Sequence, residues 1–190
     1  MYAGRDRRIV RKEQAMGYDI VTVESNEKLA QKFAAKYQYT YLFDKDTGKY
    51  DGGGQVYFRA NIWTMGVLRS VMSKLFYTLG MDDAFVEQFM NAVSWNDGER
   101  VSPEALNKLF AALDKQANQG VENYLEPIVT TVTLESWDPE KDNKVNIIVD
   151  NKLVVRDYSL EDKNKDTMAF TLEFLDYMEI AKDLGGFEVY

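Results

Sequence analysis

The sequence predicts an α+β fold in which a small antiparallel sheet packs against about five helices. Two observations carry this prediction: strand-like segments come first, followed by segments with apolar residues at helical spacing, and a second strand-like section then precedes one last helical segment. A chain of 190 residues buries about 70% of its unfolded surface on folding, which is enough for one hydrophobic core. We therefore expect a single domain over residues 16–190, with a strand-rich insertion at 121–166.

The first 15 residues differ from the rest of the chain in composition. They hold five basic and two acidic residues and carry a net charge of +3. Because the whole chain carries −8, the remaining residues carry −11. Short charged termini are usually disordered. We expect a disordered basic extension at 1–15; the alternative is that it docks on a partner or on nucleic acid.

The segment 17–63 is expected to hold a strand, a helix and a hairpin. GYDIVTV at 17–23 is apolar and β-branched, as a strand would be, and the helix begins behind Ser25 or Asn26 as its N-cap. Its apolar side chains lie at helical spacing: Leu29, Ala30, Phe33, Ala34 and Tyr37. The alternation of Tyr39, Tyr41 and Phe43 and the extended character of 55–63 predict a hairpin around the polar loop 44–54.

Three amphipathic helices are predicted in the middle of the chain. The first starts after Trp63, with Thr64 as N-cap, and ends at Gly80. The second covers 82–93. The third starts at Ser102, followed by Pro103 at its first position, and stops near Gly120.

The last third is predicted to hold three short antiparallel strands and a helix. The β-branched segments 128–137 and 145–158 supply the strands, with Asp150-Asn151 as a tight turn. The loop 157–166 then leads to a helix that is capped by Asp166 or Thr167 and ends at Gly185-Gly186, and residues 187–190 return as an edge strand.

Several kinds of chemistry are excluded by composition. With no His and no Cys, the chain cannot form a disulfide, a Ser-His-Asp or Cys-His catalytic centre, or a zinc site of the usual kind. Two acidic loops, 44–54 and 138–142, do not fit the EF-hand pattern, because the first has Lys49 where Gly is needed and the second has Pro139 early. We predict no metal, no cofactor and no enzymatic activity, and the net negative charge disfavours nucleic-acid binding except through 1–15.

The stretch YFRANIW at 57–63 is the best candidate for a binding site. In a strand, Tyr57, Arg59, Asn61 and Trp63 would face one way and three apolar residues the other. Such residues suit stacking and carboxylate or phosphate recognition. The candidate site residues are Tyr57, Arg59, Asn61, Trp63, Trp95, Asn96 and Asp97. The alternative is that the aromatic rings are half-buried and Arg59 pairs with one of the many acids.

Four motifs together carry a resemblance: GYDI (17–20), YFRANIWTMGVLR (57–69), NDG (96–98) and LGGFEV (184–189). The chain resembles a set of small proteins of bacteriophage and actinobacterial genomes that have a YFRxNxW strand, an N-x-G turn and a C-terminal GGF. The similarity covers 16–119 and 167–190 and implies no biochemical activity. Residues 1–15 and 121–166 lie outside it.

We expect a non-enzymatic acidic binding protein, a phage or prophage accessory factor that contacts a host or phage protein. One alternative is a small-ligand protein that binds a nucleotide or carbohydrate in the Tyr/Arg/Asn/Trp pocket, and another is a structural component of a phage particle, which would self-associate. No apolar run approaches the roughly 18 residues of a membrane span. We therefore expect a cytoplasmic protein of a bacterial host that does not contact the membrane.

Overall fold

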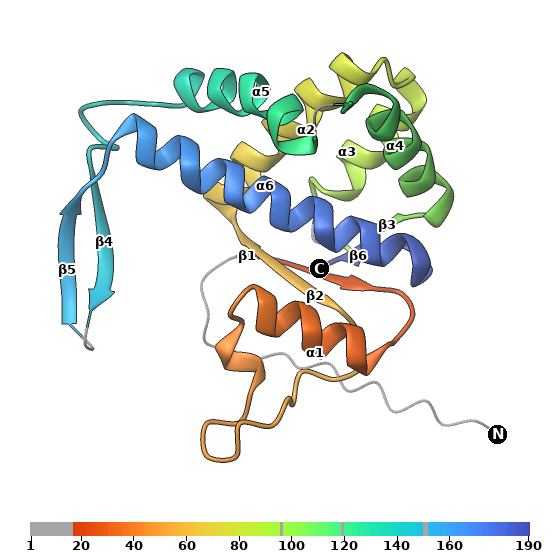
Figure 1. Cartoon of the computed structure of the whole chain (residues 1–190), viewed down its shortest axis with the longest axis horizontal. Coiled ribbons are helices and arrows are strands. Elements are labelled where there is room, and N and C mark those ends of the chain that lie inside the picture. Colours follow the sequence, from red (N-terminus) through yellow and green to blue (C-terminus); the bar gives the residue numbers. More distant parts are fainter. Residues whose placement is uncertain (1–16, 96, 119, 150–151) are drawn as a thin grey trace.

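The protein folds as a small antiparallel sheet packed on helices, as the computed structural model in Figure 1 shows. The structure describes residues 17–95, 97–118, 120–149 and 152–190. Over these residues it has six α-helices, a four-stranded sheet and a separate two-stranded sheet. The predicted α+β class is confirmed. The predicted basic extension at 1–15 and the turn at Asp150-Asn151 lie outside the described residues.

The four-stranded sheet joins segments from both ends of the chain in the order β2-β1-β6-β3. The bounds of its strands are β1 Gly17–Thr22, β2 Tyr57–Asn61, β3 Arg100–Val101 and β6 Phe187–Val189. β6 pairs with β1 on one side and with β3 on the other. The prediction of an edge strand at the C-terminus is therefore wrong, because β6 is an interior strand and the edges are β2 and β3.

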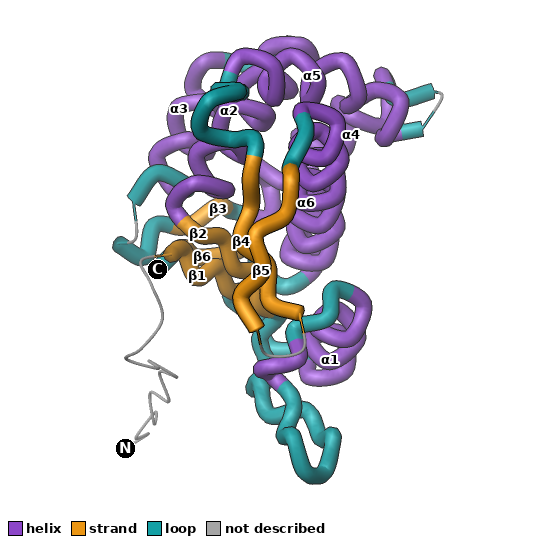
Figure 2. Tube along the Cα trace, turned by 90° about the vertical axis from the view of Figure 1, so that its left-hand side faces the viewer, coloured by secondary structure: helices purple, strands orange, loops and turns teal. Residues whose placement is uncertain are grey.

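Helices cover one face of this sheet (Figures 1 and 2). Their bounds are α1 Glu27–Lys36, α2 Ile62–Leu79, α3 Asp83–Ala92, α4 Pro103–Gln116, α5 Val121–Glu135 and α6 Leu160–Asp183. The fully buried Phe58 of β2 meets the aromatic rings of α6, with centroid distances of 4.9 Å to Phe174 and 5.1 Å to Phe170. The sheet and the last helix therefore share one core.

The predicted hairpin at 39–63 is wrong. Residues Thr40–Leu42 form a 3-10 turn, and Phe43 makes an isolated bridge with Tyr50. β2 pairs instead with β1, where Asp19 lies opposite Arg59. Tyr39 and Tyr41 pack against Tyr57 of the edge strand β2, and Phe43 packs against Tyr50. Sequence alternation cannot distinguish such packing from a strand.

The helix boundaries in the middle of the chain differ from the predictions at two points. α2 begins at Ile62, before the predicted start, because the Asn61 side chain accepts a hydrogen bond from the Thr64 amide (2.8 Å) and is the N-cap in place of Thr64. α4 is capped by Ser102 as predicted, but it ends at Gln116. Gly120, with a φ of +99°, precedes α5 and does not end α4.

The predicted strand at 128–137 is wrong, because residues 121–135 form α5. The buried apolar residues of this segment lie at i, i+3, i+4 and i+7, which is helical spacing: Leu125, Ile128, Val129 and Val132. This stripe faces α2 and α6. Burial of a continuous apolar face outweighs the small cost of β-branched residues in a helix.

The predicted loop at 157–166 is also wrong over most of its length. α6 starts at Leu160 behind a capping box, in which the Ser159 hydroxyl accepts from the Asp162 amide (3.1 Å) and the Asp162 side chain accepts from the Ser159 amide (3.0 Å). The first turns of α6 are polar because they extend beyond the core.

Candidate functional site

The predicted site begins on β2, where Tyr57 and Arg59 lie on the face opposite the buried Phe58. The Tyr57 hydroxyl donates to the Asp19 carboxylate, and the Arg59 Nε lies 3.7 Å from the same Asp19 Oδ1. The Arg59 side chain is 27% exposed. Burial raises the pKa of Tyr57, and the hydrogen bond to Asp19 raises it further. The structure thus shows one part of the alternative, the pairing of Arg59 with a neighbouring acid. The other part, half-buried aromatic rings, does not hold for Trp63, which is exposed.

Two tyrosines from the segment before β2 complete this cluster. Tyr39 and Tyr41 stack with ring centroids 5.6 Å apart, and Tyr57 stands edge-on to both at 6.2 Å. The Tyr39 hydroxyl donates to Glu173 on α6. Burial raises the pKa of Tyr39, and it raises that of Tyr41 to about 12. We call Tyr39, Tyr41 and Tyr57 the tyrosine cluster. In the sequence, Tyr39 and Tyr41 were visible only as part of an alternating pattern. The polar contacts of the cluster link the segment before β2, the sheet and α6.

Among the described residues, the other predicted site residues form no hydrogen bond, ion pair or ring contact with this cluster in the structure. Asn61 caps α2, and Trp63 lies in the first turn of α2, where its side chain is 84% exposed. Trp63 therefore does not continue the strand face of Tyr57 and Arg59, as the alternation had predicted. Trp95 is 64% exposed after α3, and Asp97 accepts from the Glu99 amide (3.2 Å). Asn96 lies outside the described residues.

A second feature stands out in the section 121–166. β4 (Lys144–Val149) and β5 (Lys152–Asp157) pair antiparallel and project from the body as a hairpin arm (Figures 1 and 2). The side chains of Leu153 and Val155 are 70% and 61% exposed, and that of Val154 is 41% exposed. Because side chains alternate along a strand, Leu153 and Val155 lie on one face of the arm and Val154 on the other. Aliphatic side chains therefore meet solvent on both faces.

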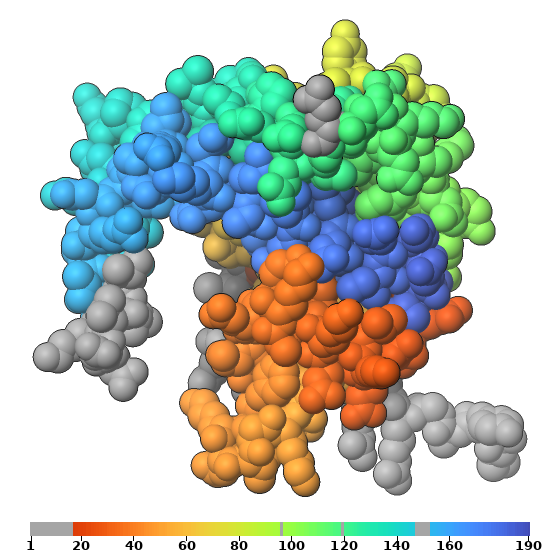
Figure 3. Space-filling model, viewed as in Figure 1, coloured from red at the N-terminus to blue at the C-terminus, as the bar shows by residue number. Residues whose placement is uncertain are grey.

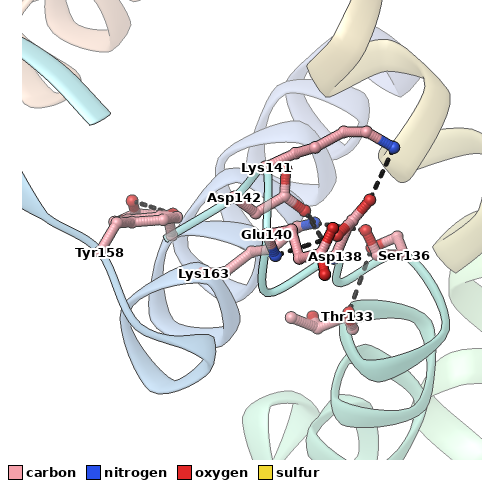
Figure 4. A network of polar contacts seen from close by, with 9 residues as sticks. Thr133, Ser136, Asp138, Glu140, Lys141, Asp142, Tyr158 and Lys163 are labelled. Carbon is pink, nitrogen blue, oxygen red and sulfur yellow. Dashed lines mark hydrogen bonds and ion pairs between the residues drawn. The ribbon is translucent and has the colours of Figure 1, made fainter. Parts of the chain in front are cut away.

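The root of the hairpin arm is held to the body by a polar network (Figure 4). The Lys163 ammonium of α6 donates to the Ser136 carbonyl (2.7 Å) and to the Asp142 carboxylate (3.0 Å), which also accepts from the Asp138 amide (3.0 Å). These bonds lower the pKa of Asp142, the Asp138 amide having the larger effect and Lys163 the smaller. Directly after β5, the Tyr158 hydroxyl donates to the Asp166 carboxylate (2.7 Å).

This network restrains the arm where it leaves the body. Lys163 is only 17% exposed, and it also lies 5.5 Å from the centre of the Trp137 ring. An ion pair that is partly buried and carries additional hydrogen bonds is better defined in geometry than an exposed one. The exposed aliphatic residues of the arm are therefore presented from a fixed base.

A third feature is a groove between α2 and α5. It has a volume of about 580 Å³ and is lined by Ser73, Lys74, Tyr77, Thr78, Pro127, Ile128 and Thr131. The Tyr77 side chain is 88% exposed along it. A second groove, of about 550 Å³, adjoins it at Ser73 and Lys74, where Lys74 pairs with Glu135 (3.1 Å). None of the seven predicted site residues lines either groove.

Within the described ranges no three acidic side chains gather in a group that could hold a metal ion. None of the helices in the described part of the chain combines the length and the apolar character that a membrane span requires. In comparisons with known proteins, no family model, no curated protein and no solved structure matches this chain.

Proposed function

We propose that this chain is a non-enzymatic protein-binding protein and that the hairpin arm is its contact element. The observation that carries the proposal is the exposure of Leu153, Val154 and Val155 on a two-stranded arm. A two-stranded hairpin is marginally stable in water unless its strands pack on something or pair with a further strand. Neighbouring exposed aliphatic side chains on a protruding element are typical of surfaces that contact another protein.

The backbone of the arm supports the same proposal. The Tyr158 amide donates to the Asn143 carbonyl (2.9 Å), and in an antiparallel ladder such bonded pairs alternate with non-bonded ones. In the register of β4 and β5, Leu153 and Val155 fall at non-bonded positions, so their backbone groups point away from β4. An outer strand of this kind can accept a further strand from a partner.

The alternative of a small-ligand site on β2 receives less support. Tyr57 and Arg59 are both already engaged with Asp19, and neither groove on α2 includes them. A ligand carboxylate or phosphate would have to displace Asp19. The assignment as a phage or prophage accessory factor that acts on a host or phage protein stays a prediction that rests on the sequence resemblance.

Site-specific photo-crosslinking tests the proposal. A photoreactive amino acid replaces Val155 on the arm in one protein and Leu134 in a control, since Leu134 is a comparably exposed aliphatic residue (61%) on α5. After irradiation in a lysate of the host, we expect adducts from position 155 that are absent from position 134. The double change Leu153→Thr and Val155→Thr, which keeps β-branched residues in the strand, should remove captured proteins. Equal capture by the wild type and this double variant would refute the proposal.

A further inference from the structure

We propose that the groove of about 550 Å³ between α2 and α3 binds a small organic anion through Arg69. The group that Arg69 recognises in this site is a phosphate or a carboxylate. The inference goes beyond the proposed function and does not rest on it, because it concerns another surface of the molecule. In the space-filling view of Figure 3, the hairpin arm stands at the left, whereas residues of α3 and α4 lie at the right.

Arg69 is a half-buried cation without an acidic partner. It lines the groove, and it forms no ion pair with any residue in the described part of the chain, although the protein has 31 acidic residues. Arg59 and Arg156, by contrast, lie 3.7 Å and 3.8 Å from the carboxylates of Asp19 and Asp162. A partly desolvated charge is costly unless an opposite charge accompanies it. An anion in the groove would supply that charge.

The guanidinium of Arg69 is held from one side. Its Nη1 donates to the Tyr18 hydroxyl and to the Ser94 carbonyl, each at 3.4 Å, and its central carbon lies 5.6 Å from the centre of the Tyr18 ring. A guanidinium has five N–H donors, and those on Nε and Nη2 make no hydrogen bond within the ranges that the structure describes. Donors in this fork bind the two oxygens of a carboxylate or phosphate.

The unpaired charge of the groove is positive. Its charged lining residues are two basic ones, Arg69 and Lys74, and one acidic one, Glu135, so they carry a net charge of +1. The Lys74 ammonium lies 3.1 Å from the Glu135 carboxylate, and these two charges offset each other. The charge that stays available is therefore that of Arg69. A local positive site of this kind attracts an anion even on a protein whose net charge is −8.

The groove also has room and a second donor for such a ligand. Ser73 lies four residues after Arg69 on the same face of α2, and its hydroxyl has no hydrogen-bond partner among the described residues. Gly66 lies one turn before Arg69, and a Cβ there would meet no atom within 4 Å. The volume is within the roughly 300–1,000 Å³ of typical ligand sites, and Met90 offers an apolar contact for the organic part.

Heteronuclear NMR of the full chain tests the inference. Inorganic phosphate, adenosine monophosphate and succinate are titrated to about 10 mM at constant ionic strength, and the Nε–H signal of Arg69 is followed. Adenosine is the uncharged control for its phosphate ester. We expect saturable shifts of the Arg69 signal with a Kd of about 1 mM or tighter for at least one anion, and none with adenosine. Whether adenosine monophosphate or succinate binds more tightly distinguishes a phosphate from a carboxylate ligand.

Three variants separate the charge, the space and the background. Arg69→Gln removes the charge, and Gly66→Leu fills the groove at a helical position where leucine is favoured over glycine and no atom obstructs it. Arg100→Gln is the matched control, because Arg100 also lacks an ion pair among the described residues and lies outside the groove, where it donates to the Gly185 carbonyl. Circular dichroism verifies that each variant folds.

We expect Arg69→Gln and Gly66→Leu each to weaken binding of the anion at least about 10-fold and Arg100→Gln to leave it unchanged. In the two variants, binding is read from the backbone amide of Ser73. The inference is overturned if no anion gives a saturable shift in the wild type, or if adenosine binds as tightly as adenosine monophosphate. It is also overturned if either groove variant retains the affinity of the wild type, or if Arg100→Gln weakens binding as much as Arg69→Gln.

Discussion

Replacing Gly186 with alanine should destabilise this protein far more than the same change at Gly80. Both glycines have a left-handed backbone, with φ of +86° and +66°. A Cβ at Gly186 would lie 2.1 Å from the carbonyl oxygen of Val101 on β3, whereas a Cβ at Gly80 would meet no atom within 4 Å. The two variants therefore share the conformational cost and differ in the steric one.

The magnitudes follow from these two terms. A left-handed alanine costs about 1–2 kcal/mol, and the loss of glycine flexibility in the unfolded chain returns about 0.4–1 kcal/mol, so Gly80→Ala should cost about 1 kcal/mol. At Gly186 the clash adds about 1–3 kcal/mol or more. Relief is difficult there, because the Gly186 amide donates to Ala181 (2.8 Å) and its carbonyl accepts from Val23 (3.0 Å).

Urea unfolding followed by circular dichroism measures the difference. We expect Gly186→Ala to lose about 2 kcal/mol more than Gly80→Ala, which corresponds to roughly 4–8 °C in melting temperature for a chain of this size. If the two variants agree within about 0.5 kcal/mol, the close approach between Gly186 and β3 does not constrain this junction and the reasoning is refuted.

Three further predictions concern single side chains. Thr22 is fully buried, donates to the Glu24 carbonyl (2.9 Å) and accepts from the Val56 amide (3.0 Å); Thr22→Val should therefore cost about 1–3 kcal/mol in denaturant unfolding, and Thr22→Ser, which keeps the hydroxyl, about 0.8 kcal/mol. Asn61→Ala should cost about 1 kcal/mol and Asn61→Ser much less if Asn61 is a helix cap; equal losses would contradict that role. Burial raises the pKa of Glu173 above its usual 4.5, so the folded state binds the proton of this carboxyl more tightly than the unfolded state does. The resulting stabilisation is complete below pH 4.5 and is lost as the pH rises through the raised pKa of the folded state. The side chain at 173 is neutral at every pH in Glu173→Gln. The difference in unfolding free energy between this variant and the wild type should therefore shift in favour of the variant as the pH rises from 4 to 7, and a constant difference would argue against the raised pKa.

Local interactions made several elements predictable. The caps of α1 and α4 are Asn26 and Ser102, and each accepts a hydrogen bond from an amide three residues later in its own helix. Such a bond depends only on nearby residues, so a sequence pattern can indicate it. The absence of His and Cys excludes catalytic classes without reference to any fold.

The candidate site could be predicted only in part, because the residues in it come from distant segments. The alternation in YFRANIW correctly placed Tyr57 and Arg59 on one face, since side chains alternate in any strand. It could not show that Asp19 lies opposite Arg59, because strand pairing is a contact between residues 40 positions apart. Alternation also failed at Trp63, where the Asn61 cap turns the chain into a helix.

The sequence by itself determined the α+β class, the N-caps of α1 and α4 and the exclusion of His- and Cys-dependent chemistry, all of which follow from composition and short-range spacing. Only the tertiary structure decided that 121–135 is helical, because its β-branched stripe gains more from burial against α2 and α6 than it loses in propensity. The tertiary structure also decided that β4 and β5 stand away from the core. The aliphatic residues of a strand look the same in sequence whether a neighbour covers them or not, and only the structure shows that Leu153, Val154 and Val155 are exposed.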